Sequence, residues 1–540
     1  MIQHMQNFPL RVSEIIDYAA LQHPDRKIFG RSIEGPIIET NWRDIQKDAK
    51  KFAAALIDLG VIKGDVVGVM AWNTPRQLSV WYGIPGAGAV NHTLNPRLFA
   101  DQLVYIINHA EDRFLMVDFD LLPIIEDIID QLTTVEKIIV MTDRSHMPDS
   151  KINDLLCYEE LIADQPDDFN WITGDENEAC GICYTSGTTG DPKGVVYTHR
   201  SNTLHALSAV APDMLDVSSN DRIMPVVPLF HANGWSIAYA APMVGASMVM
   251  PGRDMTPVGL FEMLELGVTF TAAVPTIWMQ MLQHLDDNNL RLPTLERVII
   301  GGASCPRSVI DKFQTKYGVQ VLHAWGMTEM SPLGTVCSFK PEVMALDHEG
   351  RLDVQGTVGH APFMINLKIT DDAGNDLPWD GESQGRLLTK GAAVVQRYHK
   401  SDTDAVDADG WFDTGDVATI NTNGYVRITD RSKDVIKSGG EWISSIELEN
   451  CAVGHPLVAE AAAIGIPHPK WDERPILVIV AAGQKPDVAE IMALMVNKFA
   501  KWQLPDDIIF MDEIPHTATG KISKLLLRQK LADQGYELPP

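Results

Sequence analysis

The segment "YTSGTTGDPKG", from Tyr184 to Gly194, gathers residue types that can bind an anion. It contains three glycines, four serine or threonine hydroxyls and Lys193, and it follows an apolar run at 180–183. Closely spaced backbone N–H groups and hydroxyls can wrap phosphate oxygens where larger side chains would block them. This composition suits a loop that binds an oligophosphate. A flexible turn rich in Gly, Ser and Thr would have the same composition, so both interpretations stay open at this point.

This segment differs from a Walker loop, in which Gly-Lys-Ser/Thr opens a helix. Here Asp191 and Pro192 separate Gly190 from Lys193, and no hydroxyl residue follows the lysine. The next run, 194–197 ("GVVY"), is typical of a β-strand. The sequence therefore predicts a loop that joins the two strands of a hairpin.

The composition limits the kinds of partner. The chain has 540 residues, of which 45% are hydrophobic and 21% charged, as in ordinary soluble enzymes. Its net charge of −28 argues against a nucleic-acid partner, because phosphate backbones attract basic surfaces. No apolar run approaches the ~20 residues of a transmembrane helix, and the N-terminus lacks the pattern of a signal peptide.

The six cysteines are scattered, which favours a reducing, cytoplasmic location. Cys180 and Cys183 form a C-x-x-C pair. No second pair or histidine cluster accompanies it, and the local pattern alternates as in a strand. Buried core cysteines are therefore favoured over a metal or redox site.

The chain is too long for one hydrophobic core, so several subdomains are expected. Helical patterns such as 42–60 alternate with short apolar runs such as 65–72, which predicts an α/β fold with parallel sheets covered by helices. An early helix is expected from Ser13, which we interpret as its N-cap. The predicted organisation has four parts: an N-terminal domain at 1–430, a β-rich subdomain within it at about 351–430, a hinge at 431–433, and a small mobile C-terminal α/β domain at 434–540.

Taken together, separated motifs make the chain resemble the adenylate-forming (AMP-binding) enzymes. This family includes acyl-CoA synthetases, the adenylation domains of peptide synthetases and beetle luciferases. The resemblance spans nearly the full length, and the motifs follow the family's order. They are the loop 185–194, "PLFHANGW" (228–235), "GGASCP" (301–306), "WGMTE" (325–329), "WFDTGD" (411–416), "DRSKDVIKSGGEWIS" (430–444) and "TGKISK" (519–524).

The resemblance implies two half-reactions with ATP, Mg²⁺ and coenzyme A. A carboxylate attacks the α-phosphorus of ATP to give an acyl-adenylate and pyrophosphate, and CoA then displaces AMP. Both steps require the protein to bring anions together and to neutralise charge, so it supplies position and electrostatics rather than a nucleophile. The expected partners are a small-molecule carboxylic acid, ATP, CoA and, as in many relatives, a second copy of the chain.

The resemblance also implies nucleotide-binding roles. The residues expected to hold the β- and γ-phosphates are Thr185, Ser186, Gly187, Thr188, Thr189 and Lys193. Thr328 would contact the α-phosphate, and Glu329 with Thr185 would hold Mg²⁺. The adenine slot would comprise Gly302, Ala303, Ser304, His323, Ala324 and Trp325, and Gly326, Met327 and Lys433 would also contact the nucleotide. Trp325 stands where the family usually has tyrosine. Asp416 and Arg431 would face the ribose.

Further roles concern the acid and CoA. Lys521 would lie over the acyl carboxylate during adenylation. Rotation about Lys433 would then bring a second set of residues to the site for CoA and AMP, namely Lys437, Ser438, Gly439, Gly440 and Trp442. His231, Trp235 and Gly302 would contact the acid, so the implied catalytic set is Lys521, His231, Thr328 and Glu329.

The expected acid is short or medium and apolar. His231 stands where amino-acid-activating domains carry aspartate, and the neighbourhood 273–278 is apolar. We expect His231 and Trp235 to share one side of a helix that begins there. A thioether and a methylene are nearly isosteric, so both 3-methylmercaptopropionate and butyrate fit. A longer-chain fatty-acyl-CoA synthetase and a luciferase-like adenylating oxygenase stay open as alternatives.

Overall fold

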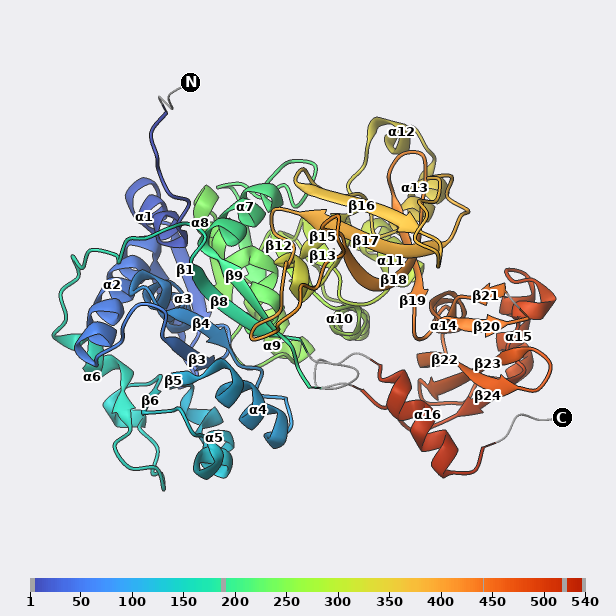
Figure 1. Ribbon diagram of the computed structural model, residues 1–540. Helices are drawn as coiled ribbons and strands as arrows, with labels where there is room; N and C mark the ends of the chain where they lie inside the picture. The colour runs from blue at the N-terminus through green and yellow to red at the C-terminus, as the bar shows by residue number, and fades with distance from the viewer. Residues whose placement is uncertain (1–4, 186–190, 440, 517–521, 537–540) are drawn as a thin grey trace.

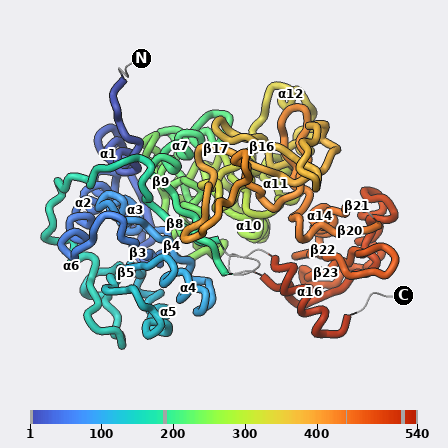
Figure 2. The backbone as a smooth tube through the Cα atoms, viewed as in Figure 1, coloured from blue at the N-terminus to red at the C-terminus, as the bar shows by residue number. Residues whose placement is uncertain are grey.

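The computed structural model describes residues 5–185, 191–439, 441–516 and 522–536 (Figure 1). A large N-terminal part, drawn from blue to orange, adjoins a smaller C-terminal part drawn in red. The tube in Figure 2 follows the chain from one part into the other. Within the described ranges, every helix is too short or too polar to cross a membrane.

The first sheet has seven strands in the order β7-β6-β5-β3-β4-β8-β9, and all neighbours are parallel except β8 and β9. Its strands are β3 (Val66–Met70), β4 (Val90–Thr93), β5 (Asp112–Val117), β6 (Lys137–Val140), β7 (Leu156–Cys157), β8 (Ala179–Tyr184) and β9 (Gly194–Thr198). The antiparallel β8–β9 pair confirms the hairpin predicted around the glycine-rich loop.

The second sheet has eight strands in the order β15-β14-β13-β12-β10-β11-β1-β2 and is parallel from β14 to β1. Its strands are β1 (Lys27–Arg31), β2 (Ile37–Asn41), β10 (Arg222–Pro225), β11 (Ser247–Met250), β12 (Phe270–Ala273), β13 (Arg297–Ile300), β14 (Gln320–Gly326) and β15 (Leu333–Val336).

Two smaller sheets follow. The β-rich subdomain is the antiparallel sheet of β16 (Ile365–Thr370), β17 (Gly385–Gly391), β18 (Phe412–Ile420) and β19 (Val426–Arg431). The C-terminal domain contains β20 (Ile436–Ser438), β21 (Glu441–Ile443), β22 (Val458–His468), β23 (Asp472–Ala481) and β24 (Asp507–Phe510). This arrangement confirms the predicted fold class.

The helices of the N-terminal part are α1 (Val12–Gln22), α2 (Trp42–Asp58), α3 (Pro75–Gly86), α4 (Ala100–Ala110), α5 (Leu122–Ile128), α6 (Tyr158–Ala163), α7 (His199–Ala209), α8 (Ile237–Val244), α9 (Pro257–Leu264), α10 (Pro275–Asp287), α11 (Arg307–Tyr317), α12 (Pro341–Met344) and α13 (His348–Gln355). The C-terminal domain adds α14 (Ser445–Val453), α15 (Val488–Val496) and α16 (Lys524–Asp533). Short 3₁₀ turns include η4 (Ala232–Ser236) and η5 (Thr328–Met330).

The first sheet is buried on both faces because its strands carry apolar side chains at successive positions. Phe114 of β5 packs with helices α2, α3 and α6, whereas the next residue, Leu115, packs with α4 and α5 on the opposite face. Successive side chains of a strand point to opposite faces, so an uninterrupted apolar run gives such a two-sided core.

Helices α2 and α3 contribute to the cores of both large sheets. In α2, Ile45 packs with the core of the second sheet and Phe52 with that of the first. In α3, Leu78 packs with the core of the second sheet and Val80 with that of the first. The hydrophobic residues of these helices therefore cover two sides, which joins the two sheets into one N-terminal part.

The expected N-cap at Ser13 is wrong. Helix α1 begins at Val12 with Arg11 as its N-cap, and Ser13 is buried in the first turn. The Val12 N–H donates to Nδ1 of His199 at 3.3 Å, which satisfies one of the N–H groups that the first turn of a helix leaves without an intrahelical partner. A contact 187 residues away along the chain thus replaces the local cap.

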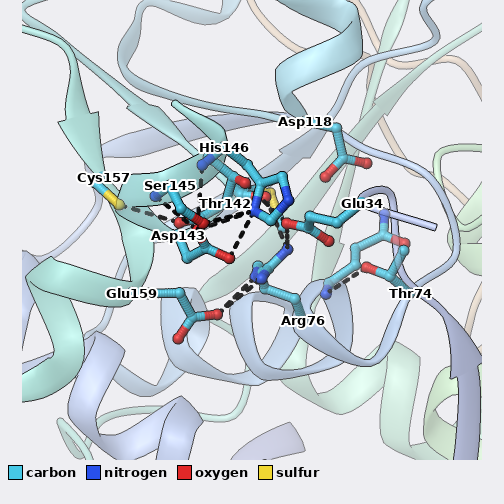
Figure 3. Close-up of polar contacts among 12 residues, drawn as sticks. Glu34, Thr74, Arg76, Asp118, Thr142, Asp143, Ser145, His146, Cys157 and Glu159 are labelled. Carbon is cyan, nitrogen blue, oxygen red and sulfur yellow. Dashed lines mark hydrogen bonds and ion pairs between the residues drawn. The ribbon is translucent and has the colours of Figure 1, made fainter. Parts of the chain in front are cut away.

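A polar cluster joins the turn between β1 and β2 to the first sheet (Figure 3). Arg76, at the start of α3, pairs with Glu34 at 3.1 Å and with Glu159 at 2.9 Å. The hydroxyl of Thr142 donates to Glu34 at 2.8 Å. Each buried charge in this cluster therefore has a partner of opposite sign, as a charge removed from water requires.

Asp118 lies beside this cluster, directly after β5 (Figure 3). Its side chain is fully buried and its Oδ2 accepts the Trp72 N–H at 2.7 Å. Burial raises the pKa of Asp118 to about 8. The folded protein therefore holds a proton there at neutral pH that the unfolded chain, with a carboxyl pKa of about 3.9, has lost.

We predict that Asp118→Asn becomes progressively stabilising relative to the native protein as the pH rises. Between pH 4 and pH 8 the folded state binds the extra proton, so rising pH lowers the native free energy of unfolding by up to about 1.4 kcal/mol per pH unit. Asparagine does not ionise, so the free energy of unfolding of the variant lacks this dependence on pH. Melting temperatures at pH 5 and pH 8 measure it, with exposed Asp149→Asn as the control. Parallel pH profiles for Asp118→Asn and the native chain would contradict the prediction.

Candidate active site

The neck of the glycine-rich loop is closed by two residues that face each other across the β8–β9 hairpin. The Thr185 N–H donates to the Lys193 carbonyl at 2.9 Å, and the Lys193 N–H donates to Thr185 Oγ1 at 3.3 Å. The residues between them that we assigned to phosphate binding (Ser186, Gly187, Thr188 and Thr189) lie outside the described parts of the chain. Thr185 and Lys193 therefore fix where that loop leaves and rejoins the sheet.

The turn η5 carries Thr328 and Glu329 and is held from two sides. The Tyr197 hydroxyl, from β9, donates to the Thr328 carbonyl at 2.8 Å. The Val395 N–H donates to the Glu329 carbonyl at 2.8 Å. The Glu329 side chain is buried, so a carboxylate that the sequence assigned to a metal stands at a defined place next to the hairpin.

Tyr398 lies between Glu329 and Lys193, and the sequence motifs did not single it out. Its hydroxyl donates to Glu329 Oε1 at 2.8 Å, and Lys193 Nζ lies 4.9 Å from its ring centroid. Burial, together with the Glu329 carboxylate, raises the pKa of Tyr398, so the phenol stays protonated and donates. Tyr398 lies 69 residues from Glu329 in the sequence, and no local pattern points to this contact.

The proposed adenine slot forms where β13 and β14 end side by side. The two strands are parallel neighbours, which brings the turn 301–304 next to 323–327. A Cβ built on Gly301 would lie 3.0 Å from the Ala324 carbonyl oxygen, so glycine permits this approach. His323 is buried and burial lowers its pKa, which favours the neutral imidazole. Gly326 ends β14, and the Met327 N–H donates to the Pro332 carbonyl at 2.9 Å.

Trp325 and Asp416 are joined directly. Trp325 Nε1 donates to Asp416 Oδ2 at 2.8 Å, and Arg431 Nε pairs with Asp416 Oδ1 at 2.9 Å. The Trp325 ring passes over Gly334, where a Cβ would lie 2.4 Å from the ring carbon Cζ3. The indole therefore supplies a flat ring like the family's tyrosine and an N–H that orients a buried carboxylate.

The acid-site residues do not lie on a regular helix, so that expectation is wrong. The backbone of η4 is left-handed, with φ of 58° at Asn233, 56° at Gly234, 53° at Trp235 and 65° at the following Ser236. Glycine adopts this region freely and asparagine tolerates it, but a bulky residue such as Trp235 is strained there, and strained residues often cluster at functional sites. The Asn233 side chain donates to Asn202 Oδ1 at 3.0 Å, which helps to hold the turn.

Trp235 is nevertheless close to the turn that carries Gly302. A Cβ built on Gly302 would lie 3.8 Å from the Trp235 carbon Cζ2. His231 precedes η4, and its ring centroid lies 6.3 Å from that of Phe230. The structure thus brings Trp235 and Gly302 together.

The proposed CoA residues lie elsewhere. Lys437 and Ser438 lie in β20, Gly439 follows it, and Trp442 pairs with Lys437 across the β20–β21 hairpin. Figure 1 places this hairpin far from β8 and β9, on the outer side of the C-terminal domain. Gly440 and Lys521 lie outside the described residues.

The two domains meet at the turn 301–304, which the sequence resemblance assigns to adenine. The Asn450 side-chain N–H of α14 donates to Ser304 Oγ at 2.8 Å. Near the predicted hinge, the Ser445 N–H donates to Asp430 Oδ2 at 2.7 Å. The C-terminal domain is therefore bonded both to the end of β19 and to the turn that follows β13.

Comparison with known proteins agrees with this arrangement. Residues 16–399 match the AMP-binding enzyme family, and residues 447–521 match the AMP-binding enzyme C-terminal domain. The chain is 48% identical over 535 residues to 3-methylmercaptopropionyl-CoA ligase of Ruegeria lacuscaerulensis, covering 99% of both chains. It is 42% identical over 535 residues to the medium-chain-fatty-acid–CoA ligase of Ectopseudomonas oleovorans, covering 99% of this chain and 98% of that one.

Among solved structures, the anthranilate CoA ligase AuaEII in complex with anthranoyl-AMP aligns with a TM-score of 0.86. The alignment has 25% identity and covers 98% of this chain and 100% of the other. The first family match covers more than half of the chain, and the curated relatives align over nearly its full length. The chain therefore belongs to the AMP-binding enzyme family.

Proposed function

We propose that the protein is an AMP-forming acid–CoA ligase whose substrate is a short or medium apolar acid, with 3-methylmercaptopropionate as the main candidate. The observation that carries this is the 48% identity, over 99% of both chains, to a relative named 3-methylmercaptopropionyl-CoA ligase. The geometry supports the same reaction class, because Lys193, Glu329 and the Trp325–Asp416 pair lie around neighbouring strand ends.

In the first half-reaction, a carboxylate oxygen of the acid forms a bond to the α-phosphorus of ATP while the bond to the bridging β-phosphate oxygen breaks. Thr185 and Lys193 hold the β- and γ-phosphates, which leave as pyrophosphate. Glu329 is a buried carboxylate, and its hard oxygen suits Mg²⁺. When bound, Mg²⁺ neutralises phosphate charge. Thr328 contacts the α-phosphate.

In the second half-reaction, the CoA sulfur attacks the acyl carbon and AMP leaves. Lys437, Ser438, Gly439, Gly440 and Trp442 serve this step, after the C-terminal domain rotates about a hinge at 431–433. The distance of the β20–β21 hairpin from β8 and β9 supports this proposal, because residues so far away need a domain movement to take part.

The adenosine part of ATP occupies the slot formed by 302–304 and 323–327. Asp416 accepts hydrogen bonds from the ribose hydroxyls, with Arg431 beside it. A carboxylate has about four lone-pair sites, so Asp416 can bond to Trp325, Arg431 and the ribose together. Trp235 and His231 border the acid, and the contact of Trp235 with the Gly302 turn supports its place there.

We further propose that the protein acts in the cytoplasm as a homodimer. All six cysteines are buried free thiols, which is compatible with a reducing compartment. The dimer is proposed from the resemblance to the family, and light scattering after size-exclusion chromatography measures it.

The identity of the acid is tested by comparing substrates. In an assay of CoA-dependent AMP release, 3-methylmercaptopropionate should give the highest kcat/KM, with butyrate within about a factor of ten, because one methylene in an apolar pocket decides only ~1–3 kcal/mol. Amino acids and benzoate should be poor substrates. A higher kcat/KM for decanoate would favour a longer-chain synthetase, and light emission without CoA consumption would favour a luciferase-like oxygenase.

The role of Lys521 is tested by measuring the two half-reactions separately. Lys521→Ala should abolish acid-dependent pyrophosphate release, because the proposed cation over the attacking carboxylate is lost. The variant should still convert supplied acyl-adenylate and CoA to thioester. Lys498→Ala, on the exposed linker after α15, is the matched control and should leave both half-reactions unchanged. If Lys521→Ala impairs both half-reactions equally with an unchanged melting curve, the role of Lys521 is wrong.

The role of Trp325 is tested with a variant that keeps an aromatic ring. Trp325→Phe keeps a flat ring but removes the donor to Asp416, so the KM for ATP should rise about tenfold while the KM for the acid stays nearly constant. Tenfold corresponds to ~1.4 kcal/mol, close to the worth of one hydrogen bond to a charged group. Trp72→Phe removes a comparable contact, a 3.2 Å bond from Trp72 Nε1 to Asp120, and serves as the control. Equal changes in the two KM values would exclude a role specific to the nucleotide.

A further inference from the structure

Two charges of opposite sign approach the same tyrosine from different sides. The Tyr398 hydroxyl donates to Glu329 Oε1 at 2.8 Å, and the ammonium of Lys193 lies over the Tyr398 ring at 4.9 Å from its centroid. A cation over an aromatic face is attracted by the negative face of the ring, and a carboxylate is attracted by the phenol O–H. Tyr398 therefore satisfies both groups through different parts of one side chain.

The backbone around Tyr398 is fixed to both of these neighbours. The Val395 N–H donates to the Glu329 carbonyl at 2.8 Å, and the His399 N–H donates to the Gly194 carbonyl at 2.8 Å. Gly194 directly follows Lys193. The segment 395–399 is thus bonded at one end to η5 and at the other to β9, so Tyr398 has little freedom to leave its place.

The cluster below the tyrosine is apolar. Tyr398 packs against a buried group that includes Tyr197, Val195 and Phe412. Because these residues come from β9 and β18, the ring is supported by two separate sheets. A side chain held in this way can orient a carboxylate without losing further conformational entropy at each catalytic cycle.

We propose that Tyr398 is a positioning residue that orients the Glu329 carboxylate for Mg²⁺ and the Lys193 ammonium for the β- and γ-phosphates. The inference rests on the proposed function, which assigns Mg²⁺ to Glu329 and phosphate to Lys193. The hydrogen bond to Oε1 restrains the carboxylate, and the other oxygen would be available to hold Mg²⁺. The ring keeps the lysine from neutralising the same carboxylate.

A tyrosine suits this role better than a second cation. A lysine or arginine in its place would compensate the carboxylate charge and weaken its attraction for Mg²⁺. A protonated phenol donates one hydrogen bond and leaves the charge in place. Partners that orient metal ligands typically change metal affinity or activity by about 10- to 100-fold when they are removed.

The test uses Tyr398→Phe, which keeps the ring and removes the hydroxyl. Mn²⁺ serves as the probe, and its binding to the full-length enzyme with α,β-methylene-ATP is followed by electron paramagnetic resonance. We expect Mn²⁺ to bind about tenfold more weakly. The affinity for the nucleotide without metal should be unchanged, because the ring that supports Lys193 remains. The KM for the acid should also be unchanged.

A second variant separates the two functions of the side chain. Tyr398→Leu removes the ring as well as the hydroxyl, so it should weaken Mn²⁺ binding like Tyr398→Phe. It should also weaken metal-free nucleotide binding by about threefold, within the usual range for a cation–π contact at an exposed site. If Tyr398→Leu and Tyr398→Phe bind metal-free nucleotide equally well, the part of the inference that concerns Lys193 is overturned.

The controls distinguish this inference from the proposed function. Glu329→Gln should weaken Mn²⁺ binding, and adding Tyr398→Phe to it should cause no further loss, because the tyrosine acts through the carboxylate. Tyr317→Phe removes a similar tyrosine–carboxylate bond, to Asp286 at 2.8 Å, and should leave Mn²⁺ binding unchanged.

These measurements distinguish a failure of the metal role of Glu329 from a failure of the role of Tyr398. Native Mn²⁺ binding by Glu329→Gln would overturn the metal role in the proposed function. Weak binding by Glu329→Gln together with native binding by Tyr398→Phe would overturn only the role of Tyr398. An additive loss in the double variant would show that Tyr398 acts independently of Glu329 and would also overturn the inference.

Discussion

We propose that Lys193 binds phosphate and that Glu329 binds Mg²⁺, and a site with these two groups must keep them from binding each other. At short range in a partly buried site, an ammonium and a carboxylate attract each other strongly, and a pair so formed would serve neither ligand. In this protein Tyr398 stands between Lys193 and Glu329 and contacts both. The separation of these opposite charges is the constraint on which the arrangement of the surrounding loops depends.

The fold meets this constraint by ending several strands at one edge. The turns that carry Trp235, Gly302 and Glu329 follow β10, β13 and β14, which are parallel members of the second sheet. The glycine-rich loop follows β8 of the first sheet, and ligands of parallel sheets commonly bind at such carboxyl ends. Tyr197 joins the two sheets there, because its hydroxyl extends from β9 to the Thr328 carbonyl. The scaffold thus fixes distances that no single loop could fix.

The β-rich subdomain and the C-terminal domain complete the site from the other side. Asp416 of β18 receives the indole N–H of Trp325, so the third sheet is bonded directly to β14. Asn450 of α14 reaches the Ser304 hydroxyl, so the turn assigned to adenine also contacts the C-terminal domain. Within that domain Lys524 Nζ of α16 pairs with Glu449 Oε1 of α14 at 2.7 Å, and both residues are partly buried. The C-terminal domain and the turn that we propose for adenine are therefore bonded directly to each other.

The sequence by itself determined the secondary-structure elements and where most of the motif loops lie along the chain. Alternation of helical and apolar runs predicted the parallel sheets, and the valine-rich run after Gly194 predicted the β8–β9 hairpin, because both depend on neighbours close along the chain. The tertiary structure alone decided the contacts between distant segments. Tyr398 meets Glu329 across 69 residues and Trp325 meets Asp416 across 91, separations at which periodicity carries no information. The same reason explains the two wrong local expectations: His199 caps the helix expected to begin at Ser13, and bonds such as Asn233 to Asn202 accompany a left-handed backbone where spacing alone favoured a helix.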